Sequence, residues 1–120
     1  MSTDELLDVE ALDRVRQMQR EGQPDILTRL IDVYLSSSQE LVDNLGRARA
    51  ENDLAAIELN AHTLKSSSAN LGAMAFSQLC GTLEEAARAG GASDLDAQCD
   101  RVIGDFDKVC EALKKERKDE

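Results

Sequence analysis

The chain has 120 residues, of which 42% are hydrophobic and only 2% are aromatic, and its formal net charge is −10. This length allows one domain with a single buried core, and the abundance of Leu, Ala and Glu favours helices over strands. The negative charge opposes binding to nucleic acid or to an anionic membrane surface, so we expect neither as a partner.

Turn-forming residues divide the sequence into five predicted helices. The first covers about residues 8–20, with Asp8 as its N-cap and Leu12 and Val15 on its apolar side, and we expect this short helix to cover one end of the fold. The second begins near Pro24, a residue that suits a first helical turn. Its apolar positions recur at intervals of three, four or seven residues: Leu27, Leu30, Tyr34, Leu41, Leu45 and Ala48.

The third predicted helix starts after Asn52 or Asp53 and ends at Gly72, which suits a left-handed residue after a helix. Its apolar stripe consists of Leu54, Ile57, Ala61, Leu64, Ser68 and Leu71. The fourth covers about residues 74–89 and directs inward Phe76, Leu79, Cys80, Leu83 and Ala87. The fifth has the seam of a bundle helix at Leu95, Cys99, Val102, Phe106, Val109 and Leu113.

Four long helices with short connections predict an all-α fold, an antiparallel four-helix bundle with a short additional N-terminal helix. We expect a single domain over residues 1–120, with a core over about residues 8–113. Residues 114–120 are almost all charged, so we expect this tail to fray into solvent.

The three cysteines, Cys80, Cys99 and Cys110, are odd in number and lie in apolar stretches, which favours reduced core thiols over disulfides or a zinc site. Residues 1–20 lack the apolar region of a signal peptide, and no apolar run approaches the roughly 18 residues of a membrane span. We therefore expect a cytoplasmic protein.

His62 is the single histidine, and it is the residue most suited to chemistry. A helical wheel of the third helix places it about 130° from the centre of the apolar stripe, so it points outward. An exposed histidine is compatible with simple solvation, but a neutral imidazole is also a nucleophile at physiological pH. Lys65, three residues along the same face, has the charge and reach to hold phosphoryl oxygens, although it is also compatible with an ordinary surface lysine.

Residues 61–73, AHTLKSSSANLGA, resemble the signature of histidine-containing phosphotransfer (HPt) domains, which reads roughly A-H-x-L-K-G-S-(S/A)-x-x-(L/I)-G-A. The resemblance extends to Asp53-Leu54 upstream and to Leu79-Cys80 and Leu83-Glu84 downstream, and it covers about residues 8–113. It implies that His62 accepts a phosphoryl group, that Lys65 stabilises its charge, and that Ser67 orients the backbone or the imidazole. Gly72 and Ala73 would let the helices turn and approach closely, which is also an ordinary structural use of these residues.

This chain has Ser66 where the family usually has glycine, one turn after the histidine. We expect the serine to narrow access to the imidazole without closing it, because its hydroxyl can turn back to the carbonyl of His62.

Two further candidates come from their positions in the sequence. Glu58 precedes His62 by one turn, and its carboxylate could accept the Nδ1 proton of His62 and leave Nε2 free. Arg88 lies where some family members keep a basic group near the site, although the sequence does not fix its position relative to His62. Both residues are also compatible with ordinary exposed helix positions.

The sequence contains no Gly-rich phosphate loop, kinase motif or acidic cluster suited to Mg²⁺, so we expect no ATP-dependent kinase activity and no bound cofactor. The resemblance implies a phosphorelay carrier that takes a phosphoryl group from the receiver-domain aspartate of a hybrid sensor kinase and passes it to that of a response regulator. Mg²⁺ would then be bound by the partner receiver domain, and the carrier would be a monomer.

Two other functions are considered. A receiver-binding module of the same fold that transfers no phosphate is opposed by the presence of both His62 and Lys65. A di-iron bundle enzyme would need inward Glu-x-x-His pairs from two helices, and one outward histidine does not supply them.

Overall fold

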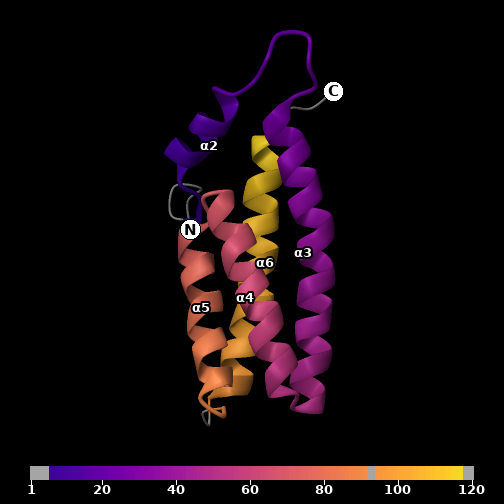
Figure 1. The fold of residues 1–120 in the computed structure, drawn as a ribbon, viewed down its shortest axis with the longest axis vertical. Helices are drawn as coiled ribbons and strands as arrows, with labels where there is room; N and C mark the ends of the chain where they lie inside the picture. The colour runs from indigo at the N-terminus through magenta and orange to yellow at the C-terminus, as the bar shows by residue number, and fades with distance from the viewer. Residues whose placement is uncertain (1–5, 92–93, 118–120) are drawn as a thin grey trace.

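The computed structural model describes residues 6–91 and 94–117, and within these ranges it contains helices and no strands. The helices are α2 (Val9–Arg16), α3 (Ile26–Glu51), α4 (Leu54–Asn70), α5 (Met74–Arg88) and α6 (Leu95–Glu116). The last four lie side by side along the long axis, and the short α2 lies at one end (Figure 1). The predicted all-α bundle with an additional N-terminal helix is therefore confirmed.

Three of the helices begin at aspartates whose side chains accept backbone N–H groups that have no partner within the helix. Asp8 accepts from Glu10 and Ala11, and Asp53 accepts from Ala56. Asp25 accepts from Thr28, so α3 begins at Ile26 and slightly later than predicted. Because such caps depend on local sequence alone, the starts of these helices were predicted to within a few residues.

The first helix is shorter than predicted, because α2 ends at Arg16 and not near residue 20. The backbone tightens there, with Met18 N–H donating to the Val15 carbonyl and Gln19 N–H to the Arg16 carbonyl. These bonds close turns of three residues and end the regular α-helix. The following loop then carries the chain across to α3.

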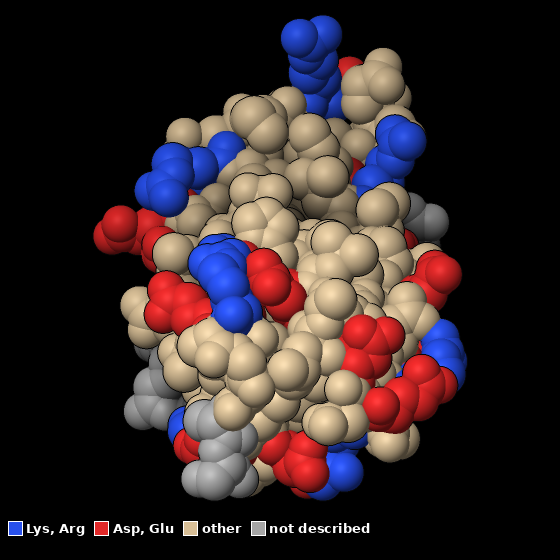
Figure 2. All heavy atoms as spheres, turned by 60° about the horizontal axis from the view of Figure 1, so that its bottom comes forward, with Lys and Arg blue, Asp and Glu red and all other residues tan. Residues whose placement is uncertain are grey.

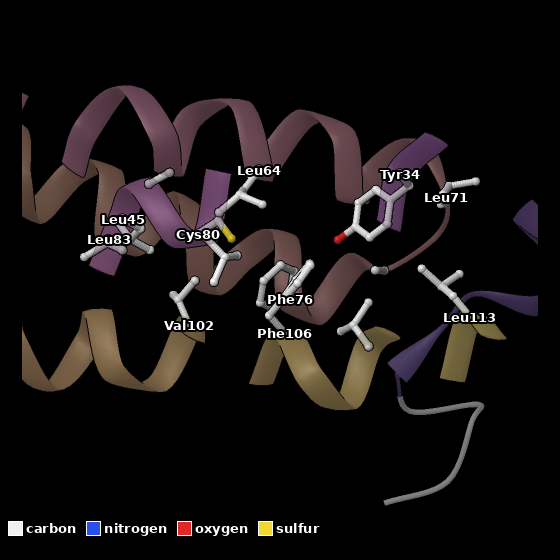
Figure 3. Packing of buried hydrophobic residues seen from close by; sticks show 14 of the residues in the cluster. Tyr34, Leu45, Leu64, Leu71, Phe76, Cys80, Leu83, Val102, Phe106 and Leu113 are labelled. Atoms are coloured by element: carbon white, nitrogen blue, oxygen red, sulfur yellow. The ribbon is translucent and has the colours of Figure 1, made fainter. Parts of the chain in front are cut away.

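The core runs the length of the bundle and has the ring of Phe106 among its largest fully buried side chains. The ring centroid of Phe106 lies 6.1 Å from that of Phe76 and 6.3 Å from that of Tyr34 (Figure 3). The buried hydroxyl of Tyr34 lies 2.7 Å from that of Ser68, and this hydrogen bond places the two residues at the same level of α3 and α4. A polar pair that satisfies itself in this way can remain in an apolar core.

One residue of the predicted apolar stripe is placed wrongly by the sequence. Leu30 is 41% exposed, whereas Ile31, the next residue, is fully buried. The buried residues at this end of α3 are Leu27, Ile31 and Tyr34, so Leu30 lies outside the face of α3 that packs against the core. An apolar side chain at a helical interval can therefore lie at the edge of the stripe and face solvent.

The connection from α4 to α5 depends on Gly72, whose φ of +78° confirms the predicted left-handed residue. A Cβ at this position would lie 2.9 Å from the carbonyl oxygen of Asp8. In return, the Asp8 N–H donates to the Gly72 carbonyl at 2.7 Å. The glycine therefore makes the turn and also lets the start of α2 attach to the bundle.

The expected fraying of the C-terminal tail is wrong for its first residues, because α6 continues to Glu116. Glu116 pairs with Arg16 at 3.4 Å and Arg117 pairs with Asp32 at 2.9 Å, so this end contacts both α2 and α3. Residues 118–120 lie outside the described ranges.

All three cysteines are free, as predicted. Cys80 and Cys99 are buried, whereas Cys110 is only partly buried, and burial raises the pKa of the Cys80 thiol to about 12. In the described part of the chain, no helix combines the length and apolar character that crossing a bilayer would require.

Candidate functional site

His62 lies in the middle of α4, and 55% of its side chain is exposed, so the predicted outward orientation is confirmed. Its Nδ1 atom lies 2.8 Å from Oε2 of Glu84, a residue of α5. An ionised carboxylate only accepts hydrogen bonds, so Nδ1 must carry the proton that joins the two groups. In the neutral imidazole, the lone pair is then on Nε2.

Glu84 is buried, with 3% of its surface exposed, although it is ionisable. Besides His62, it accepts a hydrogen bond from Nζ of Lys65 at 2.7 Å and one from a terminal nitrogen of Arg88, also at 2.7 Å. The hydrogen bond from Lys65 is the main cause that lowers the pKa of Glu84, against the opposing effect of burial, and the bond from His62 adds to it. A buried carboxylate with three donors is stable in its ionised form.

The candidate pairing of Glu58 with His62 does not form. Oε2 of Glu58 accepts from Nε of Arg88 at 3.1 Å, and the Nδ1 position that Glu58 was expected to occupy belongs to Glu84. The physical reason is that α5 packs against α4 on the side of His62 and places the buried carboxylate of Glu84 beside the imidazole. Arg88 joins Glu58 and Glu84, so the structure brings this arginine to the site that the sequence could only suggest.

We refer to His62, Lys65, Glu84, Arg88 and Glu58 as the His62 cluster. All its members come from α4 and α5, so the packing of these two helices determines the cluster.

Lys65 is held in place at three points along its length. Its carbonyl accepts a hydrogen bond of 2.8 Å from the hydroxyl of Ser77, and its Nζ bonds to Glu84. The middle of its side chain passes over Gly81, where a Cβ would lie 3.2 Å from Cδ of the lysine. The lack of a side chain at Gly81 therefore leaves room for the lysine to reach the buried carboxylate.

Ser66 and Ser67 lie beside the cluster but do not join it. Ser66 is exposed and Ser67 is partly buried. Several hydroxyls in the described helices donate to the carbonyl four residues earlier, for example those of Ser37 and Thr63, but Ser66 makes no such bond to His62. Within the described residues, the Ser67 hydroxyl likewise forms no hydrogen bond to the imidazole or to the backbone. Both serines are near the imidazole only through their positions on α4.

Glu84 is the residue that the sequence reasoning missed as a functional candidate. A signal was present, because Glu84 follows Cys80 by four residues and precedes Ala87 by three, which places it in the apolar stripe of α5. A carboxylate at a core position has to be paired, since burial of an unpaired charge is costly. The sequence did not show which donors would pair with it.

The surface next to His62 is uncharged over a wide area. Glu58 and Lys65 are the two charged residues of α4, and both take part in the His62 cluster. The other exposed residues of α4 carry no charge. On the adjoining side of α3, the exposed residues Leu30, Val33 and Ser37 are uncharged, whereas Glu40, one turn after Ser37, brings a negative charge to their edge. We define the uncharged face as the following residues: Leu30, Val33, Ser37, Leu59, Thr63, Ser66 and Asn70.

Figure 2 shows this side of the bundle from below, with a tan band of uncharged side chains between charged groups. Leu59 and Val33 are two large apolar side chains of the uncharged face, 66% and 65% exposed. Large exposed apolar side chains on one face indicate a surface for a protein partner. The described residues contain no group of three or more His, Cys, Asp or Glu side chains arranged to hold a metal ion.

Comparisons with known proteins agree with the sequence signature. Residues 29–116 match the Hpt domain, a phosphotransfer domain and not a kinase domain. Among solved structures, the fold is similar to histidine-containing phosphotransfer protein B (HptB) from Pseudomonas aeruginosa PAO1, with a TM-score of 0.83 and 28% sequence identity over 93% of this chain and 94% of that one. A search of curated proteins found no match. Because the match covers most of the sequence, the chain belongs to the Hpt domain family.

Proposed function

We propose that this protein carries a phosphoryl group on Nε2 of His62 between the receiver domains of a phosphorelay. The observation that carries the proposal is the hydrogen bond from His62 Nδ1 to the buried carboxylate of Glu84. It fixes the tautomer and orientation of the ring, so that the unprotonated Nε2 is the atom available to a partner.

The transfer step needs no base on this protein. The Nε2 lone pair attacks the phosphorus of a receiver phospho-aspartate, the N–P bond forms, and the P–O bond to the aspartate breaks so that the aspartate leaves as a carboxylate. The imidazole keeps its Nδ1 proton and becomes cationic. The adjacent negative charge of Glu84 stabilises this cation, and the reverse sequence of steps delivers the group to a second receiver.

Lys65 and Arg88 supply positive charge beside the imidazole. Both are bound to Glu84 in the free protein, and both have exposed side chains that can move toward the oxygens of an incoming phosphoryl group. Lys65 is the stronger candidate because it lies one turn from His62 on the same helix. A receiver would bring its own Mg²⁺ and further charge stabilisation to the complex.

The receiver would dock on the uncharged face. A relay requires complexes that form and separate repeatedly, and an interface of modest size with few buried charges has this property. A binding module that holds receivers without transferring phosphate is the alternative. It does not account for an exposed nucleophilic nitrogen held in one tautomer by a buried carboxylate.

The experiment is incubation of the protein with a radiolabelled, phosphorylated receiver domain, with the variant His62→Gln as a control. We expect label that is lost in acid and survives alkali, as a phosphoramidate does, and no label on the variant. Because His62 faces solvent, the variant should retain its helical content by circular dichroism. Label that persists on the variant, for example on Ser66 or Ser67, would refute the proposal. A stable receiver complex without label would favour the binding module.

A further inference from the structure

A surface pocket of about 350 Å³ lies where the loop between α2 and α3 meets the start of α3, at the upper end of the bundle in Figure 1. Apolar side chains of Met18, Ile26, Leu30 and Val33 line it. Met18 is 57% exposed although it is a large apolar residue. Several large exposed apolar side chains around one hollow indicate a binding surface.

The loop that forms this pocket is held by the side chain of Gln19. Its Nε2 has two protons, which the carbonyls of Arg20, Gln23 and Pro24 share at N···O distances of 2.9–3.1 Å, and its Oε1 accepts from the Ile26 N–H at 2.6 Å. One carboxamide therefore satisfies four backbone groups of the loop. A partner does not have to order this loop on binding, which lowers the entropic cost of association.

Two arginines, Arg20 and Arg29, also line the pocket. Both side chains are exposed. Asp25 directs its carboxylate to the N–H and hydroxyl of Thr28, and Glu21 lies in the loop but not in the pocket wall. In a chain with a net charge of −10, two such cations beside an apolar pocket favour a partner with carboxylates around an apolar side chain.

The pocket is continuous with the uncharged face, because Leu30 and Val33 belong to both. Tyr34 of α3 and Ser68 of α4 are hydrogen-bonded and lie at the same height in the bundle. Along the bundle axis, His62 lies six residues to one side of this level and Leu30 lies four residues to the other side, a separation of ten residues. At about 1.5 Å per residue, the pocket edge is about 15 Å from His62 along the bundle. A standard interface of about 800 Å² per partner is roughly 28 Å across, so an interface centred between His62 and the pocket edge would cover both.

We propose that this pocket, with Arg20 and Arg29 at its rim, is a second contact for the receiver domain that docks at His62, and that it selects receivers with an apolar side chain flanked by carboxylates. The inference rests on the proposed function and names the chemistry of the partner. The two arginines would accelerate encounter with acidic receivers, while the reacting groups at His62 would be unaffected.

The test uses the receiver domain that labels His62 fastest and compares two double variants in single-turnover transfer. The first is Arg20→Glu with Arg29→Glu. The matched control is Arg101→Glu with Lys108→Glu, which makes the same change of net charge on α6, where both side chains are more than half exposed. A third variant, Arg20→Lys with Arg29→Lys, keeps the charge.

For the pocket variant we expect the half-saturating receiver concentration to rise about tenfold or more, with the saturated transfer rate unchanged within about twofold. The control should shift the half-saturating concentration by less than about threefold, and the lysine variant should behave nearly as the wild type. Raised salt should weaken binding of the wild type more than that of the pocket variant.

Equal shifts in the pocket variant and the control would show a general effect of net charge and would overturn the inference. So would concentration-dependent dimerisation in sedimentation equilibrium that is lost in the pocket variant, because the occupant would then be a second copy of this chain. If no receiver labels the wild type, the proposed function itself fails. Normal labelling with unchanged kinetics in the pocket variant refutes the second contact alone.

Discussion

The buried carboxylate of Glu84 allows the sharpest test of the His62 cluster, through the variant Glu84→Gln. The amide has nearly the same shape but a single acceptor oxygen. If that oxygen stays with Nδ1 of His62, the NH₂ group faces the ammonium of Lys65, and two donors cannot bond to each other. Lys65 must then release, although its exposed position lets it reach water.

The cost in stability at neutral pH follows from this loss. A hydrogen bond to a charged group contributes about 1.5–3 kcal/mol, and the exposure of Lys65 reduces this, so we expect the variant to be about 1–2 kcal/mol less stable. Transfer should slow by about ten- to a hundredfold, because the cationic phosphohistidine loses its counter-charge.

The pH dependence of stability distinguishes the loss of the Glu84 charge from a change in packing. The pKa of Glu84 is lowered in the folded state, so the stability due to its ionisation is present above the unfolded pKa, near 4.3, and is lost as the pH falls through the lower folded value. Urea unfolding at pH 7 and at successively lower pH should therefore show a difference between wild type and variant that shrinks in acid. A difference that is the same at every pH, or a variant that transfers at the wild-type rate, would refute this reasoning.

Three further predictions concern the surroundings of His62. Lys65→Ala should slow single-turnover transfer by about ten- to a thousandfold, and it should also cost about 1–2 kcal/mol of stability, because it removes the same hydrogen bond to the buried carboxylate of Glu84. Unchanged transfer would make Lys65 a purely structural partner of Glu84. Gly81→Ala should stabilise α5 by up to about 1 kcal/mol but slow transfer by displacing Lys65, and in a Lys65→Ala background it should leave the rate unchanged. Ser66→Gly should transfer as fast as wild type or faster despite a less stable helix, whereas Ser66→Gln should keep the fold and hinder the receiver. Melting temperatures measured beside the rates would show whether the rate follows helix stability instead of access to His62. A Gln variant with the wild-type rate would show that receivers approach from another side.

The sequence was sufficient for features that depend on neighbouring residues. Asp8 and Asp53 cap helices through bonds to N–H groups two or three residues away, and Gly72 ends α4 because of its own backbone freedom. The outward position of His62 follows from helical periodicity in the same way.

Tertiary structure decided which groups meet across helices. Glu84 is 22 residues from His62 in sequence, and the alignment of α4 with α5 brought its carboxylate to Nδ1 and directed Glu58 to Arg88 instead. The exposure of Leu30 and its place in the pocket wall depended likewise on which face of α3 packs against the neighbouring helices. Periodicity determines the face of a helix on which a residue lies, but only the packing of one helix against another determines its partner, because their rotation and relative height are set by the whole core.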